Sequence, residues 1–185
     1  MNIILTESQI QKLIGEEVEL SELRKSHMRF VSDKVKSVTG QEWPEYVLTD
    51  WLYKNTKNFD PKWDTPNSYM KLVERQIKLF IKMFGKGHWE FKKVKVNIGV
   101  FNPEIRKTIA NRSDITKNPY GVDNDFERFM TQQSLLSNTG EVSKEPIICI
   151  MKPDGLFLLE GFHRTITYLK EFGEYDQNIY IYYPD

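Results

Sequence analysis

Six consecutive residues near the end of the chain, Glu-Gly-Phe-His-Arg-Thr from Glu160 to Thr165, combine a glycine with three side chains that can donate to phosphate. A glycine between a strand and a helix lets the backbone turn sharply and approach a ligand closely. The first amides of the helix and its dipole favour an anion at that point. Histidine and arginine add donors, and the planar arginine fork can bond two phosphate oxygens at once. The predicted phosphate-binding residues are Gly161, Phe162, His163, Arg164 and Thr165.

Carboxylates before and around this turn are the candidates for acid–base chemistry. Glu160 ends the preceding strand, where it could orient His163 or accept a proton. Asp123 and Asp125 lie just before a predicted helix, and phosphoryl transfer needs a carboxylate to position a hydroxyl or to hold Mg²⁺. We therefore predict Glu160, His163, Asp123 and Asp125 as catalytic residues. Glu160 and His163 have a Glu-x-x-His spacing that can serve a metal, but no second His or Cys cluster supports a permanent metal site, and we predict none.

Each of these residues also has a purely structural explanation. Arg164 could simply pair with an acidic residue, and Glu160 could be an ordinary surface carboxylate. Asp123 and Asp125 could complement the dipole of the helix that follows them. The residue types alone leave both explanations open.

The first 88 residues are predicted to be a helical region, and residues 89–185 a small α/β domain. Helical spacing of apolar residues is clearest between Tyr69 and Phe84, which Gly85 ends. Weaker helical patterns and an aromatic loop precede it. The patterns predict helices at residues 6–14, 21–38 and 45–54 and an ordered loop up to Pro66.

The second half alternates between strand and helix patterns. A polar stretch between the turns at Asn102-Pro103 and Asn118-Pro119 receives no assigned element. The last strand is apolar, and we expect it at a sheet edge where it could mediate pairing. The predicted strands are residues 93–98, 147–151, 156–159 and 179–183, and the predicted helices are residues 126–136 and 165–172.

The block GEVSKEPIICIMKPDGLFLLEGFHRTITYLKEFG, with its neighbours over roughly residues 93–183, resembles the ParB/sulfiredoxin superfamily. The shared features are a helix, a proline followed by an apolar strand, an Asp-Gly turn, a second strand, and a Gly-x-His-Arg turn that opens a helix. The resemblance implies an α+β fold: a helical region followed by a small ParB/sulfiredoxin-like domain. It also implies a nucleotide ligand, ATP or another nucleoside triphosphate, with Mg²⁺.

The resemblance implies different activities for different branches of the superfamily. Sulfiredoxins carry a catalytic cysteine where this chain has Phe162, which argues against their chemistry. In the ParB branch the Asn-Pro-Tyr motif is followed by Pro-Arg, whereas Asn118-Pro119-Tyr120 is followed here by Gly121-Val122. Small-molecule kinases of the superfamily have Asp-Gly-His-His-Arg, which residues 160–164 match except for Glu in place of Asp and Phe in place of the first His.

We therefore expect a phosphotransferase that uses a nucleoside triphosphate and acts on a small molecule or a modified nucleotide or DNA. The alternatives are a non-catalytic ParB-like DNA-binding or phage scaffold protein and, third, a nuclease. The start ILTESQ is similar to that of many phage proteins. The expected partner is a nucleotide, with DNA as the partner in the alternative function and no membrane; the sequence leaves oligomer formation open.

Composition bounds these expectations. Lys+Arg and Asp+Glu are equal at 26 each, so the chain as a whole has no general attraction to nucleic acid or to an anionic membrane. No apolar run approaches the ~20 residues of a membrane span. The single cysteine, Cys149, cannot form an internal disulfide, which favours a reducing compartment. We expect a cytoplasmic protein, in the host cytoplasm if phage-encoded.

Overall fold

The computed structural model describes residues 28–53, 66–112 and 125–185. The chain forms two compact units, Met1–Ile81 and Lys82–Asp185, which are described separately below. The predicted boundary lay after residue 88. The predicted helix at residues 6–14, most of the aromatic loop and Asp123 lie outside the described residues. In the described part of the chain, no helix is both long and apolar enough to cross a membrane.

The first unit is helical in the residues that can be described. A helix covers residues 28–39. It is followed by α2 (Glu45–Val47), the π-helical segment η1 (Leu48–Tyr53) and α4 (Pro66–Phe84). The rings of Trp43 and Trp51 meet Phe80 of α4 edge-on, at centroid distances of 4.8 and 5.2 Å. Trp43 is therefore a core residue, and the partly exposed Trp51 packs against the same ring, which argues against a platform for stacking bases.

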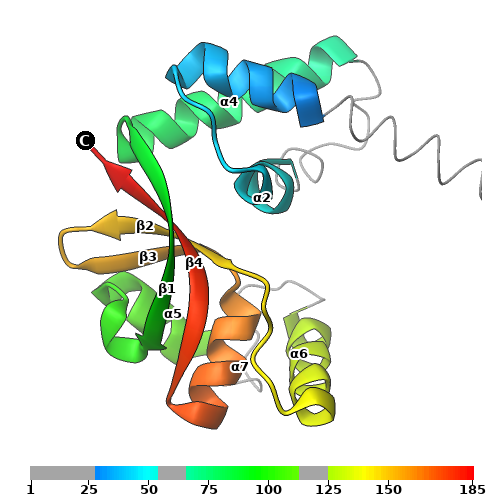
Figure 1. The fold of residues 1–185 in the computed structure, drawn as a ribbon, viewed down its shortest axis with the longest axis vertical. Coiled ribbons are helices and arrows are strands. Elements are labelled where there is room, and N and C mark those ends of the chain that lie inside the picture. Colours follow the sequence, from blue (N-terminus) through cyan, green and yellow to red (C-terminus); the bar gives the residue numbers. More distant parts are fainter. Residues whose placement is uncertain (1–27, 54–65, 113–124) are drawn as a thin grey trace, which may run out of the picture. The chain divides into compact units, whose positions relative to one another are not determined.

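The second unit is a four-stranded mixed sheet with helices on one face, which confirms the predicted α+β class (Figure 1). The strand order is β1-β4-β2-β3, in which β4 runs antiparallel to β1 and parallel to β2. Strands β2 and β3 form an antiparallel hairpin. The elements are β1 (Gly87–Asn97), η2 (Ile98–Val100), α5 (Pro103–Arg112), α6 (Asp125–Thr139), β2 (Ile147–Lys152), β3 (Gly155–Glu160), α7 (Phe162–Phe172) and β4 (Glu174–Pro184).

Residues that alternate along the strands pack against α5, α6 and α7 to form the core of this unit. Ile147 and Cys149 of β2 and Ile179 of β4 are within 1% of complete burial. They meet Phe129 of α6 and Ile166 of α7 in the same cluster. The buried side chains on one face of each strand therefore hold the helices whose ends form the candidate site.

The last strand was predicted at a sheet edge, and that prediction is wrong. Strand β4 lies between β1 and β2 and is hydrogen-bonded on both sides. Pairing with β1, for example Phe91 with Tyr180, joins residues that are far apart in sequence. Such a pairing partner cannot be read from the local pattern of residues 179–183.

Helix α5 occupies the polar stretch to which the sequence reading assigned no element. Asn102 is 98% buried, and its Oδ1 accepts a hydrogen bond from the amide of Ile105 at 2.9 Å. Pro103 is the first residue of the helix, the position that proline tolerates best. The pair read as a turn is therefore a helix start, with asparagine as the N-cap.

Candidate functional site

The predicted phosphate-binding turn lies at the junction between β3 and α7. Glu160 is the last residue of β3, and Gly161 precedes the helix with φ 99° and ψ 19°. The amide of Thr165 donates to the carbonyl of Gly161 at 2.9 Å, closing the first helical turn. Helix α7 thus begins at Phe162, three residues before the predicted start.

Gly161 is required by the fold itself. Its backbone lies in the left-handed region, and a Cβ at this position would stand 2.6 Å from Cγ2 of Ile147. Both constraints exclude a side chain there without strain. With no side chain at this position, Gly161 makes no side-chain cap on the positive end of α7.

Arg164 contacts protein groups at this junction. Its Nη1 forms an ion pair with Glu145 Oε2 at 2.6 Å, and its guanidinium donates to the carbonyls of Glu145 and Pro146, each at 3.2 Å. Arg164 is 8% exposed, whereas the Glu145 side chain is 70% exposed. Arg164 therefore pairs with an acidic residue, as its purely structural explanation predicted.

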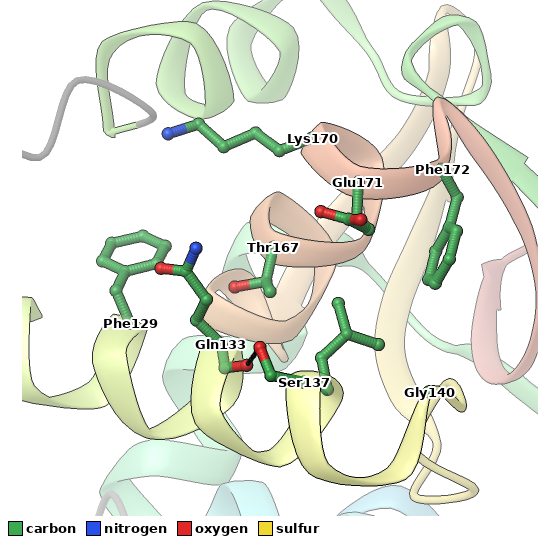
Figure 2. A pocket seen from close by; sticks show the side chains of 9 residues that line it. Phe129, Gln133, Ser137, Gly140, Thr167, Lys170, Glu171 and Phe172 are labelled. Carbon is green, nitrogen blue, oxygen red and sulfur yellow. Dashed lines mark hydrogen bonds between the residues drawn. The ribbon is translucent and has the colours of Figure 1, made fainter.

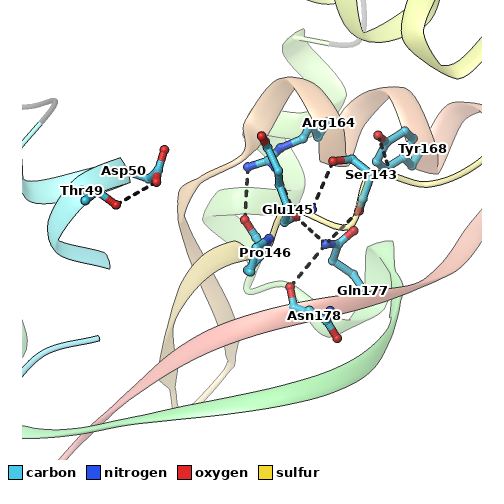
Figure 3. A network of polar contacts seen from close by, with 9 residues as sticks. All are labelled: Thr49, Asp50, Ser143, Glu145, Pro146, Arg164, Tyr168, Gln177 and Asn178. Atoms are coloured by element: carbon cyan, nitrogen blue, oxygen red, sulfur yellow. Dashed lines mark hydrogen bonds and ion pairs between the residues drawn. The ribbon is translucent and has the colours of Figure 1, made fainter. Parts of the chain in front are cut away.

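The ion pair belongs to a polar network that holds the segment before β2 (Figure 3). Gln177 of β4 is 3% exposed and donates from Nε2 to the carbonyl of Glu145 at 2.8 Å. The hydroxyl of Tyr168 on α7 accepts from the amide of Ser143 at 2.9 Å. Side chains from α7 and β4 thus supply the partners for backbone groups of a segment that has no regular structure.

Thr165 faces the core rather than a ligand. It is fully buried, and its hydroxyl lies beside that of Tyr175. Neither hydroxyl has a well-formed hydrogen bond among the described residues. Burial raises the pKa of Tyr175 to about 12, and the nearby Thr165 hydroxyl opposes this rise only in part.

His163 joins the turn to helix α6. Its partly exposed imidazole meets the ring of Phe129 edge-on, at a centroid distance of 4.8 Å. Asp125 begins α6, one helical turn before Phe129. The structure therefore brings His163 and the start of α6 together, although the side chain of Asp125 lies outside the description.

Helices α6 and α7 lie side by side and run in the same direction (Figure 1). Phe129 near the start of α6 meets His163 near the start of α7, and towards the other end Gly140 and Phe172 line a common pocket. The amino ends of both helices therefore meet on the side of Gly161. This arrangement depends on tertiary packing, and no motif in the sequence indicates it.

The pocket between these helices runs from Phe129 towards their carboxyl ends, where Gly140 and Phe172 line it (Figure 2). Its volume is about 220 Å³. Both polar and apolar side chains line it, and sequence reasoning did not find it because its two walls come from separate elements. The lining residues are Phe129, Gln133, Leu136, Ser137, Gly140, Thr167, Lys170, Glu171 and Phe172.

Glu160, the last residue of β3, lies at the junction, and exposed cations lie on α5. Arg106 and Lys107 are exposed on α5. Glu160 is partly exposed at the end of β3, where it pairs in register with Ile148. Among residues 28–53, 66–112 and 125–185, no three His, Cys, Asp or Glu side chains are grouped as a metal site.

No protein-family model, no curated protein and no solved structure matches this chain. The function is therefore argued from the chain's own residues and their arrangement. The most informative arrangement is the shared amino end of α6 and α7.

Proposed function

We propose that the second unit binds the phosphates of a nucleoside triphosphate at the joined amino ends of α6 and α7 and transfers the terminal phosphoryl group to an acceptor. The observation that carries the proposal is the parallel packing of these two helices, with His163 against Phe129. In this proposal the domain belongs to the ParB/sulfiredoxin type, and its ligand is ATP or a related triphosphate.

Electrostatics support an anion at this place. Each helix dipole is equivalent to roughly half a positive charge at its amino end. Two such ends side by side repel each other, and an anion between them relieves the repulsion. The left-handed backbone of Gly161 makes the sharp turn by which α7 begins at this place. The second helix roughly doubles the field that a single helix end would provide.

The residues at the junction have different roles in the proposed site. His163 is partly exposed and can donate to a phosphate oxygen. Arg164 acts first as a positioning residue because its guanidinium holds the segment before β2. The carboxylate of Glu145 is mostly exposed, so a phosphate group could replace it on Arg164.

The carboxylates fit this chemistry if a divalent cation accompanies the nucleotide. Mg²⁺ commonly binds through one or two carboxylates together with substrate phosphates, so a cluster of three protein ligands is not needed. Asp125 or Asp123 would hold the cation, which would neutralise part of the charge on the phosphates. Glu160 or one of these aspartates would accept the proton of the acceptor hydroxyl as its oxygen bonds to phosphorus and the nucleoside diphosphate leaves.

Titration calorimetry with ATP, CTP and GTP, each with and without Mg²⁺, tests the binding step. We expect saturable binding to the native chain and a loss of about tenfold or more in His163→Ala, because a hydrogen bond to an ionised phosphate contributes roughly 1.5–3 kcal/mol. Lys170→Ala is the matched control, since it removes a cation from the other end of the same helix. Its affinity should change by less than about twofold.

Either of two results would refute the site. One is an absence of binding by every nucleotide; the other is unchanged binding in both His163→Ala and Arg164→Ala. Thermal unfolding of each variant separates a lost ligand contact from a lost fold. If binding holds, transfer of labelled terminal phosphate to candidate acceptors distinguishes an enzyme from a nucleotide-binding scaffold.

A further inference from the structure

Helix α4 carries a row of cations along its exposed face. Lys71, Arg75, Lys78 and Lys82 are all exposed, and they are separated by four, three and four residues. At 3.6 residues per turn, this spacing places them within about 60° of arc around the helix axis. The buried residues Val73, Ile77 and Phe80 lie on the opposite side. The row therefore lies on the face of the helix that points away from the core.

The charge of this row is only partly balanced. Glu74 is bound by Lys34 at 2.8 Å and by Lys78 at 2.6 Å, and these lysines lower its pKa to about 2. Three further cations of the row, Lys71, Arg75 and Lys82, have no ion pair with a carboxylate in the described ranges. A chain with equal numbers of acidic and basic residues thus concentrates positive charge on one helix.

We propose that this row binds the phosphate backbone of a nucleic acid. From Lys71 to Lys82 the row extends about 16 Å along the helix axis, a length over which duplex DNA carries about ten phosphates. The row consists of lysine and arginine, which contact phosphates without reading the base sequence. We therefore expect sequence-independent binding, and this surface does not depend on the proposed nucleotide site.

The exposed apolar residues favour nucleic acid over a lipid surface. Leu79 and Met83 flank the row and are 40% and 68% exposed. A helix that lies in a membrane interface needs a continuous apolar face, whereas the apolar face of α4 is already buried in the protein. Two isolated side chains offer little area for insertion between lipids.

Fluorescence anisotropy with a labelled duplex of random sequence tests the proposal across a series of salt concentrations. We expect the affinity to fall with salt at a log–log slope of about −3 to −4, since each phosphate neutralised contributes roughly −0.9. The triple variant Lys71→Gln/Arg75→Gln/Lys82→Gln should lower the affinity by about tenfold or more and bring the slope near −1. Lys78 stays in place because it holds Glu74.

The matched control is Lys93→Gln/Lys107→Gln/Lys144→Gln, which removes the same charge from exposed positions elsewhere. It should keep the affinity within about twofold and the slope unchanged if the row is the binding surface. Equal losses in the two triple variants, or no binding of duplex or single-stranded DNA or RNA, would overturn the proposal. So would binding only to phosphatidylserine vesicles or to polyglutamate. Circular dichroism checks that both variants keep their helices.

Discussion

The guanidinium of Arg164 contacts a carboxylate and two carbonyls, so its role in the structure differs from the role that its residue type predicts. An arginine after a Gly-x-His sequence is typical of phosphate binding, yet here it links α7 to the segment before β2. Thr165 was likewise predicted to bind phosphate, but it is a buried core residue. His163 alone of the three remains a partly exposed donor.

Arg164 should matter more to stability than its partner Glu145. Removing the arginine side chain takes away one donor from each of two carbonyls in addition to breaking the ion pair, and we expect Arg164→Ala to lower the free energy of unfolding by about 3 kcal/mol. Glu145→Ala breaks the ion pair but keeps the carbonyl contacts, so we expect a loss of about 1 kcal/mol. Urea denaturation measures both. An equal or greater loss in Glu145→Ala would show that the carboxylate, rather than the backbone contacts, stabilises the segment.

At the scale of single elements, local patterns predicted most of the second unit. Strand β2, the turn before β3 and helix α6 all lie close to their predicted positions. Strand β1 and helix α7 begin earlier than predicted, and α5 and β4 differ for reasons that lie in the structure. Helix α5 has a weak apolar pattern and was recognisable only by its Asn-Pro start, and β4 is longer than its apolar stretch because β1 pairs along its length.

At the β3–α7 junction we expect even a very small added side chain to lower the stability of the fold strongly. Gly161→Ala introduces a methyl group near Ile147 and forces alanine into a left-handed backbone, so we expect a loss of about 3 kcal/mol or more in stability. Gly173→Ala is the control, because Gly173 has φ 70° but no atom within 4 Å of the added Cβ. It should cost only the backbone strain, about 1–2 kcal/mol. Similar urea midpoints for the two variants would contradict the close packing at Gly161.

The stability of the whole molecule should decline in alkaline solution. Burial raises the pKa values of Tyr175 and Tyr182 to about 12, against 10.0 for an exposed phenol. Below pH 10 these phenols are protonated in both the folded and the unfolded chain, and their contribution is complete. Between pH 10 and 12 the unfolded chain releases the protons first, so the free energy of unfolding falls as pH rises, by about 2 kcal/mol for Tyr175.

Urea denaturation at a series of alkaline pH values measures this decline, and phenolate absorbance follows the titration. Tyr175→Phe is a direct control. It removes a buried hydroxyl that has no well-formed hydrogen bond among the described residues, so stability at neutral pH should be unchanged or slightly higher. The variant should also lose part of the alkaline decline. Titration of Tyr175 at the ordinary pKa would contradict its burial.

The sequence by itself determined the α+β class, most of the helices and strands of the second unit, and the glycine turn that joins β3 to α7. These features depend on residues close together in the chain, whose spacing and turn chemistry act locally. Only the tertiary structure decided that Arg164 pairs with Glu145, that β4 is central, and that the amino ends of α6 and α7 meet. Each of these depends on contacts between distant segments, whose partners are chosen by the packing of the whole core rather than by local pattern.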